Sequence, residues 1–167
     1  MKQLIFFIIS ILYFSSNIIA QKANKCDSKE YHLFDFWIGE WNVVDSTDNI
    51  LGTNTVSIKQ GRCLIHENWT GSRGTSGESL NYYDVSDSSW NQIWVDNKGS
   101  SLKLKGNISD GKMVLKSDLI SNSTGNYRNV ISWEKKGENV LQLWYTENSQ
   151  NTNKKILFYG IYKPLKK

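Results

Sequence analysis

The sequence is poor in proline and cysteine. Its single proline, Pro164, follows the last apolar segment, where it interrupts no strand. Its two cysteines are Cys26 and Cys63, and neither a Cys-x-x-Cys motif nor a closely spaced histidine pair occurs. A protein zinc site needs such a set of ligands, so the composition argues against one. We therefore expect no metal and no cofactor.

Long hydrophobic runs are also missing. The longest apolar run, 4–14, is well short of the roughly 20 residues that a membrane-spanning helix needs. It follows one cation, Lys2, and leads through a short polar stretch to Ala20, a pattern typical of a secretory signal peptide. We expect cleavage after Ala20 and an exported protein, periplasmic or extracellular, with no membrane association afterwards. An uncleaved anchor is the alternative.

Charge of one sign is not concentrated in any part of the chain. Lysine and arginine number 20, aspartate and glutamate number 16, and the net charge is +4. Basic residues alternate with acidic ones, whereas a nucleic-acid-binding surface needs a basic patch or stripe. We expect no nucleic-acid partner, and the pattern favours no particular oligomeric state.

The two cysteines both lie in the expected mature chain. In an exported protein, two cysteines form a disulfide more often than a metal or redox site. A bond between Cys26 and Cys63 would join the N-terminal segment to the third predicted strand. Two independent thiols are the alternative.

Short alternating segments separated by turn residues make up the chain after Trp41. The turns are rich in Asp, Asn, Ser and Gly, as at 46–49 and 109–111. The predicted strands are 40–46, 52–60, 62–70, 78–85, 89–97, 100–107, 111–120, 126–135, 138–147 and 153–163. Their connections are too short for crossover helices, so neighbouring strands must pair antiparallel.

The uniform succession of strands predicts the fold class. We expect an all-β protein, a single antiparallel up-and-down barrel of about ten strands, preceded by one short helical turn at 30–38. A sandwich is the alternative, although no long Greek-key connection is visible. The expected organisation is a signal peptide at 1–20, an N-terminal segment with the aromatic turn at 21–37, and one barrel domain at 38–167. The longer loops, 71–77 and 121–126, are expected at the barrel mouth.

Polar and aromatic side chains share one face of several predicted strands. Gln-x-Trp occurs twice, and tryptophan offers a broad apolar face with one donor while glutamine offers a donor and an acceptor. The predicted lining of an interior pocket comprises Glu67, Trp69, Asn81, Gln92, Trp94, Asp96, Gln142 and Trp144. Such a pocket suits a small polar-aromatic ligand, with flat apolar faces and polar edges. The alternative is a filled barrel whose polar groups satisfy one another.

Two acids are candidates for general acid–base chemistry, Glu67 and Asp96. If both face the interior, desolvation raises their pKa values and makes one a plausible base. Buried acids also serve only as hydrogen-bond anchors, so no catalytic residue is assigned firmly. His66 alternates away from Glu67 and is expected on the opposite face, and His32 is expected to cap or pack the aromatic turn.

The segment 32–41 is the most aromatic part of the chain. Trp37, followed by Gly39 and Trp41, is typical of a short turn that closes one end of a barrel and begins its first strand. Arg128, in the eighth predicted strand, is expected either to cover Trp41 as a cation or to bind an anionic ligand.

The motif FDFWIGEW and the segments after it resemble a family of secreted bacterial proteins of unknown function with a lipocalin-like (calycin) barrel. The segments that carry this resemblance are 34–41, Cys63, 67–71, 77–81, 90–99 and 158–162. The resemblance spans nearly the whole mature chain. It implies a lipocalin- or fatty-acid-binding-protein-like barrel, export and a ligand pocket. It identifies no catalytic residue. A similarity to nitrobindin-type haem barrels is weaker, because the last strands lack histidine.

The function that we expect first is binding of a small molecule inside the barrel rather than catalysis. An isomerase- or lyase-type enzyme that uses a buried acid as its general base is the second hypothesis. The third is a structural or protein-interaction module with a filled barrel and an exposed apolar patch.

Overall fold

The computed structural model describes residues 25–123, 125–148 and 153–165. The expected signal peptide, 1–20, lies outside these residues. The described elements are three 3₁₀-helices, η1 (Lys29–His32), η2 (Asp35–Trp37) and η3 (Gln60–Arg62). The strands are β1 (Gly39–Val44), β2 (Ile50–Lys59), β3 (Leu64–Gly71), β4 (Ser76–Asp84), β5 (Ser89–Asp96), β6 (Ser101–Ser109), β7 (Lys112–Lys116), β8 (Ile120–Asn122), β9 (Gly125–Lys136), β10 (Asn139–Asn148) and β11 (Lys154–Pro164).

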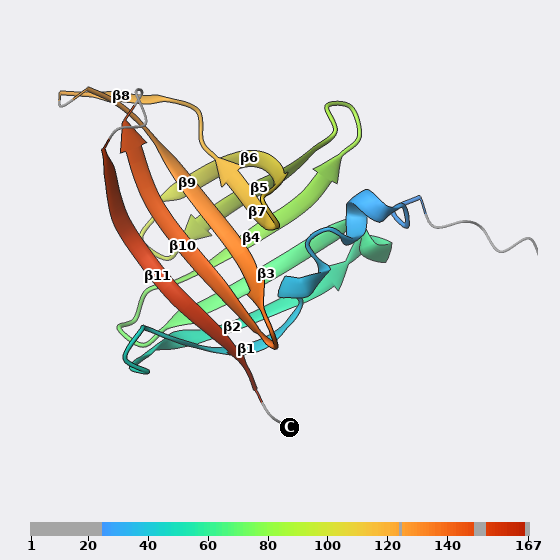
Figure 1. The fold of residues 1–167 in the computed structure, drawn as a ribbon, viewed down its shortest axis with the longest axis horizontal. Helices are drawn as coiled ribbons and strands as arrows, with labels where there is room; N and C mark the ends of the chain where they lie inside the picture. Colours follow the sequence, from blue (N-terminus) through green and yellow to red (C-terminus); the bar gives the residue numbers. More distant parts are fainter. Residues whose placement is uncertain (1–24, 124, 149–152, 166–167) are drawn as a thin grey trace, which may run out of the picture.

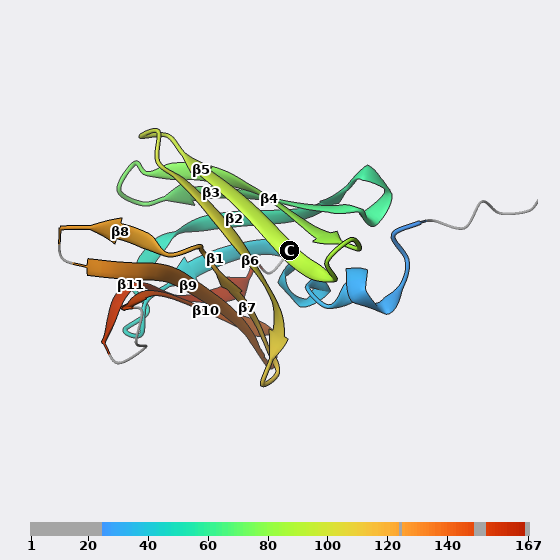
Figure 2. The ribbon, with the colours of Figure 1, turned by 90° about the horizontal axis from the view of Figure 1, so that it is seen from above.

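Ten of these strands close into an antiparallel barrel, and β8 adds a short extra pairing to the start of β9. Closure comes from pairing of the first strand with the last, where Val44 lies opposite Ile161, and from β9 pairing with both β7 and β10. Figures 1 and 2 show the N-terminal segment at one end of this barrel and β8 at the other. The predicted fold class, a single up-and-down barrel with little helix, is confirmed.

Two predicted elements differ in detail from the structure. The predicted strand 111–120 is divided into β7 and β8, because Ser117 Oγ accepts the backbone N–H of Asn129 at 2.9 Å and thereby ends the regular ladder. The predicted helical turn at 30–38 is two 3₁₀-helices separated by Leu33 and Phe34. Hydrophobic periodicity reports neither difference.

Four aromatic residues fill one end of the barrel, and we call Phe34, Trp37, Trp90 and Trp133 the aromatic plug. Phe34 stacks on Trp37 with ring centroids 4.9 Å apart and an interplanar angle of 19°. Its ring meets Trp90 and Trp133 edge to face, at 5.5 and 5.1 Å. All four side chains are buried. The N-terminal segment therefore contributes two of the largest side chains of the core.

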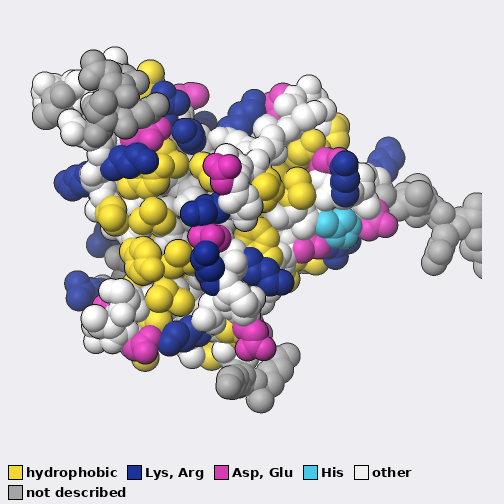
Figure 3. Space-filling view, viewed as in Figure 1, with side chains coloured by type: hydrophobic (Ala, Val, Ile, Leu, Met, Phe, Trp, Pro, Cys, Tyr) yellow, Lys and Arg dark blue, Asp and Glu magenta, His cyan; other side chains and the backbone are white. Residues whose placement is uncertain are grey.

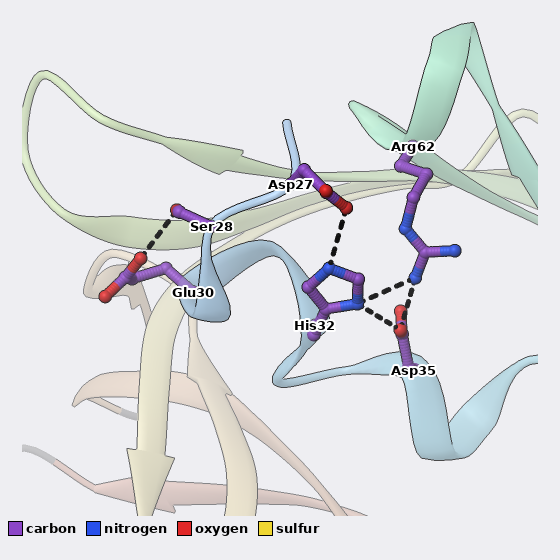
Figure 4. A network of polar contacts seen from close by, with 6 residues as sticks. All are labelled: Asp27, Ser28, Glu30, His32, Asp35 and Arg62. Atoms are coloured by element: carbon purple, nitrogen blue, oxygen red, sulfur yellow. Dashed lines mark hydrogen bonds and ion pairs between the residues drawn. The ribbon is translucent and has the colours of Figure 1, made fainter. Parts of the chain in front are cut away.

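The N-terminal segment is fastened to the barrel by covalent and polar contacts. Cys26 and Cys63, 37 positions apart, form the predicted disulfide. Figure 4 shows His32 between Asp27 and Asp35, with Arg62 reaching Asp35 from η3. His32 thus takes part in a network of ion pairs beside the aromatic turn. Its hydrogen bond to Asp35 raises its pKa.

The glycine before β1 allows Trp41 to close the same end. Gly39 has φ +154°, and a Cβ there would lie 3.1 Å from the Trp41 ring. The Trp41 indole N–H donates to the Trp37 carbonyl oxygen at 3.0 Å. The roles expected for Trp37, Gly39 and Trp41 at the closed end agree with this packing.

Arg128 lies on the outer face of the barrel rather than over Trp41. Tyr127 and Asn129 line the open end of the barrel, so Arg128 between them points outward. Its Nε lies 3.8 Å from Glu147 Oε1, and Lys116 Nζ lies 3.4 Å from the same oxygen. The outward position follows from strand alternation, and it separates Arg128 from both Trp41 and the interior.

The described residues also bear on compartment. No helix within 25–123, 125–148 or 153–165 has the length and apolar character needed to cross a membrane. The disulfide is compatible with an exported protein, because disulfides persist in oxidising compartments.

Truncation of the plug should destabilise the whole barrel. Phe34 is fully buried, and a Phe34→Ala change leaves a cavity among the three tryptophans, so we expect a loss of about 3–5 kcal/mol in the free energy of unfolding. Leu33→Ala is the matched control, since Leu33 is 38% exposed. Urea denaturation followed by tryptophan fluorescence measures both. Equal, small losses would show that the plug is not a core element.

Candidate ligand-binding site

Three strands repeat the same order of inward-facing side chains. Along each of them an apolar residue, a polar residue and a tryptophan follow at every second position, so the three share one face. These triplets are Ile65, Glu67 and Trp69 on β3, Trp90, Gln92 and Trp94 on β5, and Val140, Gln142 and Trp144 on β10. The barrel interior is therefore layered, with an apolar closed end, a polar middle and an aromatic outer level.

An inner cavity of about 90 Å³ lies at the polar and aromatic levels. Its lining is Glu67, Trp69, Gln92, Trp94, Ile131, Gln142, Trp144, Phe158 and Tyr162. Six of the eight residues predicted to line a pocket are in this set, and they come from β3, β5 and β10. The cavity is large enough for several water molecules or a small organic group.

An outer vestibule of about 670 Å³ adjoins the inner cavity. The two share Trp69, Trp94, Trp144 and Phe158, which we call the aromatic collar. Residues Ser72, Arg73 and Thr75 from the turn between β3 and β4 line the vestibule, as do residues flanking the 121–126 loop, Ile120 and Tyr127. The turn at 71–77 thus lies beside the open end, whereas residues 121–122 and 125–126, expected in a loop there, belong to the paired strands β8 and β9.

Glycines on neighbouring strands make room for two collar tryptophans. A Cβ at Gly77 would lie 2.3 Å from Trp94 Cζ2, and one at Gly52 would lie 2.8 Å from Trp69 Cη2. Any side chain at either position would displace the indole beside it. The positions of the Trp69 and Trp94 indoles therefore depend on the absence of a side chain at Gly52 on β2 and at Gly77 on β4.

Glu67 is the central polar group of the inner cavity, and its side chain is only 4% exposed. Its Oε1 accepts a hydrogen bond from Asn54 Nδ2 at 2.7 Å, and its Oε2 accepts one from Ser79 Oγ at 2.6 Å. Ser79 Oγ in turn accepts from Asn81 Nδ2 at 2.8 Å. Because a serine hydroxyl has one hydrogen, this network directs its donors toward the carboxyl group.

The carboxyl group of Glu67 is buried without a charged partner. Desolvation raises its pKa from 4.5 to about 7, and the hydrogen bonds from Ser79 and Asn54 oppose that rise. Tyr162, also in the lining, has its pKa raised well above the usual value by burial and by the nearby negative charge of Glu67. Glu67 can therefore exchange a proton at neutral pH, while Tyr162 stays a neutral phenol.

Two glutamines present free polar atoms in the same lining. Gln92 Nε2 donates to Asn81 Oδ1 at 2.7 Å, which leaves Gln92 Oε1 without a hydrogen-bond partner among the described residues. The Tyr162 hydroxyl donates to Gln142 Oε1, which leaves Gln142 Nε2 similarly unpaired in that part of the chain. The cavity thus offers a carboxyl group, an amide oxygen and an amide N–H₂.

Two predicted lining residues lie elsewhere. Asn81 is fully buried behind Gln92 and Ser79, where it orients both. Asp96 lines the vestibule, and its carboxylate accepts the backbone N–H groups of Lys98 and Ser100 at 2.9 and 2.8 Å. These bonds lower its pKa, led by the one from Ser100. The raised pKa expected for a buried acid occurs at Glu67 and is wrong for Asp96, which stabilises a turn.

The strand alternation also placed the histidine correctly. His66 lies on the outer face, with Nε2 2.8 Å from Glu78 Oε2. Five residues of the site were not predicted: Asn54, Ser79, Ile131, Phe158 and Tyr162. The alternation of the last strand put Phe158 and Tyr162 on one face, and this was the available signal. Asn54 sits among threonines that face outward, so nothing local marked it.

Comparison with protein-family models and with curated proteins finds no match. Within the described residues, no three His, Cys, Asp or Glu side chains come together in a way that could hold a metal ion. The candidate site is therefore defined by its own geometry: a buried carboxyl group and two amide groups, each with one atom unpaired in the described residues, beneath an aromatic collar.

The raised pKa of Glu67 predicts a specific dependence of stability on pH. Between 4.5 and about 7 the folded state binds more protons at this group than the unfolded state, so stability falls as pH rises through this window. The loss is about 3 kcal/mol. Glu67→Gln should remove it, whereas Glu78→Gln on the outer face should change the profile little. Urea denaturation from pH 4 to 8 measures the difference, and parallel profiles for wild type and Glu67→Gln would contradict the assignment.

Proposed function

We propose that the protein is exported and binds a small molecule in the inner cavity. The observation that carries this proposal is the convergence of the Glu67 carboxyl group, Gln92 Oε1 and Gln142 Nε2 beneath the aromatic collar. Gln92 Oε1 and Gln142 Nε2 have no hydrogen-bond partner among the described residues, and both glutamines line the cavity. A ligand in the cavity could therefore hydrogen-bond to these atoms without displacing a bond within the protein.

The shape and chemistry of the lining favour a particular kind of ligand. The aromatic collar suits a flat or compact apolar group, and the polar level beneath it suits hydrogen-bonding atoms at one end of the molecule. A fatty acid is a poorer fit, because its chain would have to lie against the buried carboxyl and amide groups. The ligand is thus best described as a small molecule with an apolar body and a polar edge.

Export and family membership belong to the same proposal. The signal-peptide pattern at 1–20, the disulfide and the similarity to secreted lipocalin-like proteins all support export into an oxidising compartment. An interior site with an open mouth fits a protein that captures a molecule outside the cytoplasm.

Native purification followed by mass spectrometry tests the binding function. We expect wild-type protein to carry a small molecule, and Trp94→Ala to lose it because one quarter of the aromatic collar is removed. Ile93→Ala is the matched control, since Ile93 is the neighbouring residue on the outer face and is 38% exposed. Its occupancy should equal that of wild type. An empty wild-type protein that no member of a broad metabolite panel stabilises against heat would overturn the proposal.

An acid–base enzyme is the second candidate, and the pKa of Glu67 favours it. A carboxyl group that titrates near pH 7 can take and return a proton at neutral pH, and Gln142 Nε2 could stabilise a developing oxyanion. Conversion of the recovered ligand by wild type, lost in Glu67→Gln with binding retained, would establish this function. Recovery of the ligand unchanged would mean that the protein binds it without catalysing a reaction.

A filled, purely structural barrel is not proposed. Figure 3 shows apolar side chains interspersed with lysine and arginine over β9, β10 and β11, and Leu157 and Tyr159 are exposed there. The inner cavity argues against a filled interior, and the basic residues interrupt the apolar surface.

A further inference from the structure

The inner cavity contains one carboxyl group and no basic side chain among its lining residues. The two groups that donate hydrogen bonds to Glu67, Asn54 and Ser79, are both neutral. A buried carboxylate is costly unless an opposite charge compensates it. Within the part of the chain that the structure describes, ionised Glu67 has no ion-pair partner in contact with it.

The cations near the barrel lie outside the inner cavity. Arg73 lines the vestibule from the turn between β3 and β4. Lys116 and Arg128 point outward and share Glu147. None of these three is in the lining of the inner cavity. The centre of the barrel therefore holds the acidic side chain of Glu67, and none of these three basic side chains lies beside it.

The aromatic collar adds a second attraction for positive charge. Aromatic ring faces carry partial negative charge, and tryptophan binds cations most strongly of the three aromatic side chains. Trp69 and Phe158 meet edge to face with centroids 5.9 Å apart at 85°, so their rings form a corner. Trp144 is held by its indole N–H, which donates to Asn129 Oδ1 at 2.9 Å. Three tryptophans and a phenylalanine thus surround the path to Glu67.

We propose that the ligand of the inner cavity is a small organic cation, a quaternary ammonium or a protonated amine, held by Glu67 and the aromatic collar. This inference rests on the proposed binding function and adds the charge of the ligand. Each carboxylate oxygen accepts one hydrogen bond from the protein and retains a lone pair for the N–H of a protonated amine, whereas a quaternary ammonium would be attracted by charge alone. Gln92 Oε1 provides a further acceptor.

Few other titratable groups face Glu67. Tyr162 from β11 lies in the same lining. His66 and Glu78 pair with each other on the outer face of β3 and β4, and His66 acts on Glu67 only by its charge through the sheet. Asp96 and Arg73 belong to the vestibule. Ionisation of Glu67 is therefore the step that controls cation binding between pH 6 and 8.

Matched pairs of probes of nearly equal shape test the charge preference directly. Choline and 3,3-dimethyl-1-butanol differ in the positive nitrogen, and 2-phenylethylamine and 2-phenylethanol differ in the ammonium group. Isothermal titration of wild-type protein at pH 8 should show each cation binding at least about tenfold more tightly than its neutral partner. Choline is charged at every pH, so its affinity should fall about tenfold from pH 8 to pH 6 as Glu67 takes up a proton.

Substitution of the carboxyl group supplies the control. Glu67→Gln should abolish the preference for the cation and the pH dependence. Glu78→Gln removes the same charge from the outer face of the next strand and should keep both. The pH dependence of wild type is an independent measurement should Glu67→Gln fold poorly.

The outcomes separate this inference from the binding function. Equal or tighter binding of the neutral probes, or a neutral or anionic molecule carried by the purified protein, would overturn the cation and leave the binding function standing. A cationic molecule carried by the protein, lost in Glu67→Gln, would support both. Absence of any bound molecule and of binding by every probe would contradict both.

Discussion

Packing of Phe34 and Trp37 into one end of the barrel is the contact on which the remaining structure depends. The two rings stack at 4.9 Å and meet Trp90 and Trp133, so the closed end is filled from outside the ring of strands. The Cys26–Cys63 disulfide holds the segment that supplies them. Since this end is filled by aromatic side chains, the interior space is left at the polar and aromatic levels, where Glu67 and the aromatic collar lie. The most aromatic motif of the chain thus shapes the site without lining it.

The polar middle of the barrel is a compromise between stability and recognition. Burial of Glu67 destabilises its charged form, and the donors Asn54 and Ser79 recover only part of that cost, as the raised pKa shows. An apolar residue at this position would give a more stable core. Violations of core-packing rules are expected where a protein binds or reacts. A cationic ligand would supply the compensating charge that the described residues do not.

Most of the fold was predictable from local patterns, and the site was predictable in part. Alternation and turn residues located all ten barrel strands, because one face of each is buried. The same alternation placed Gln92, Trp94, Gln142 and Trp144 inside. It missed the contribution of Asn54, because the polar residues on both sides of it, Thr53 and Thr55, hide the alternation at that point. It also misplaced the role of Asp96, whose turn hydrogen bonds depend on backbone geometry that composition does not report.

Titration of the Glu67 carboxyl group by carbon-13 NMR tests whether a buried carboxyl group waits for a cation inside the barrel, and Glu67→Gln identifies its signal. In ligand-free protein we expect a midpoint near pH 7, because the carboxyl group is buried without an ion-pair partner. Saturation with an organic cation such as choline should move that midpoint downward, because the bound positive charge favours the carboxylate. A midpoint at the ordinary value of 4.5 in the ligand-free protein would show that the Glu67 carboxyl group is not desolvated and would contradict its role as a buried cation-binding group.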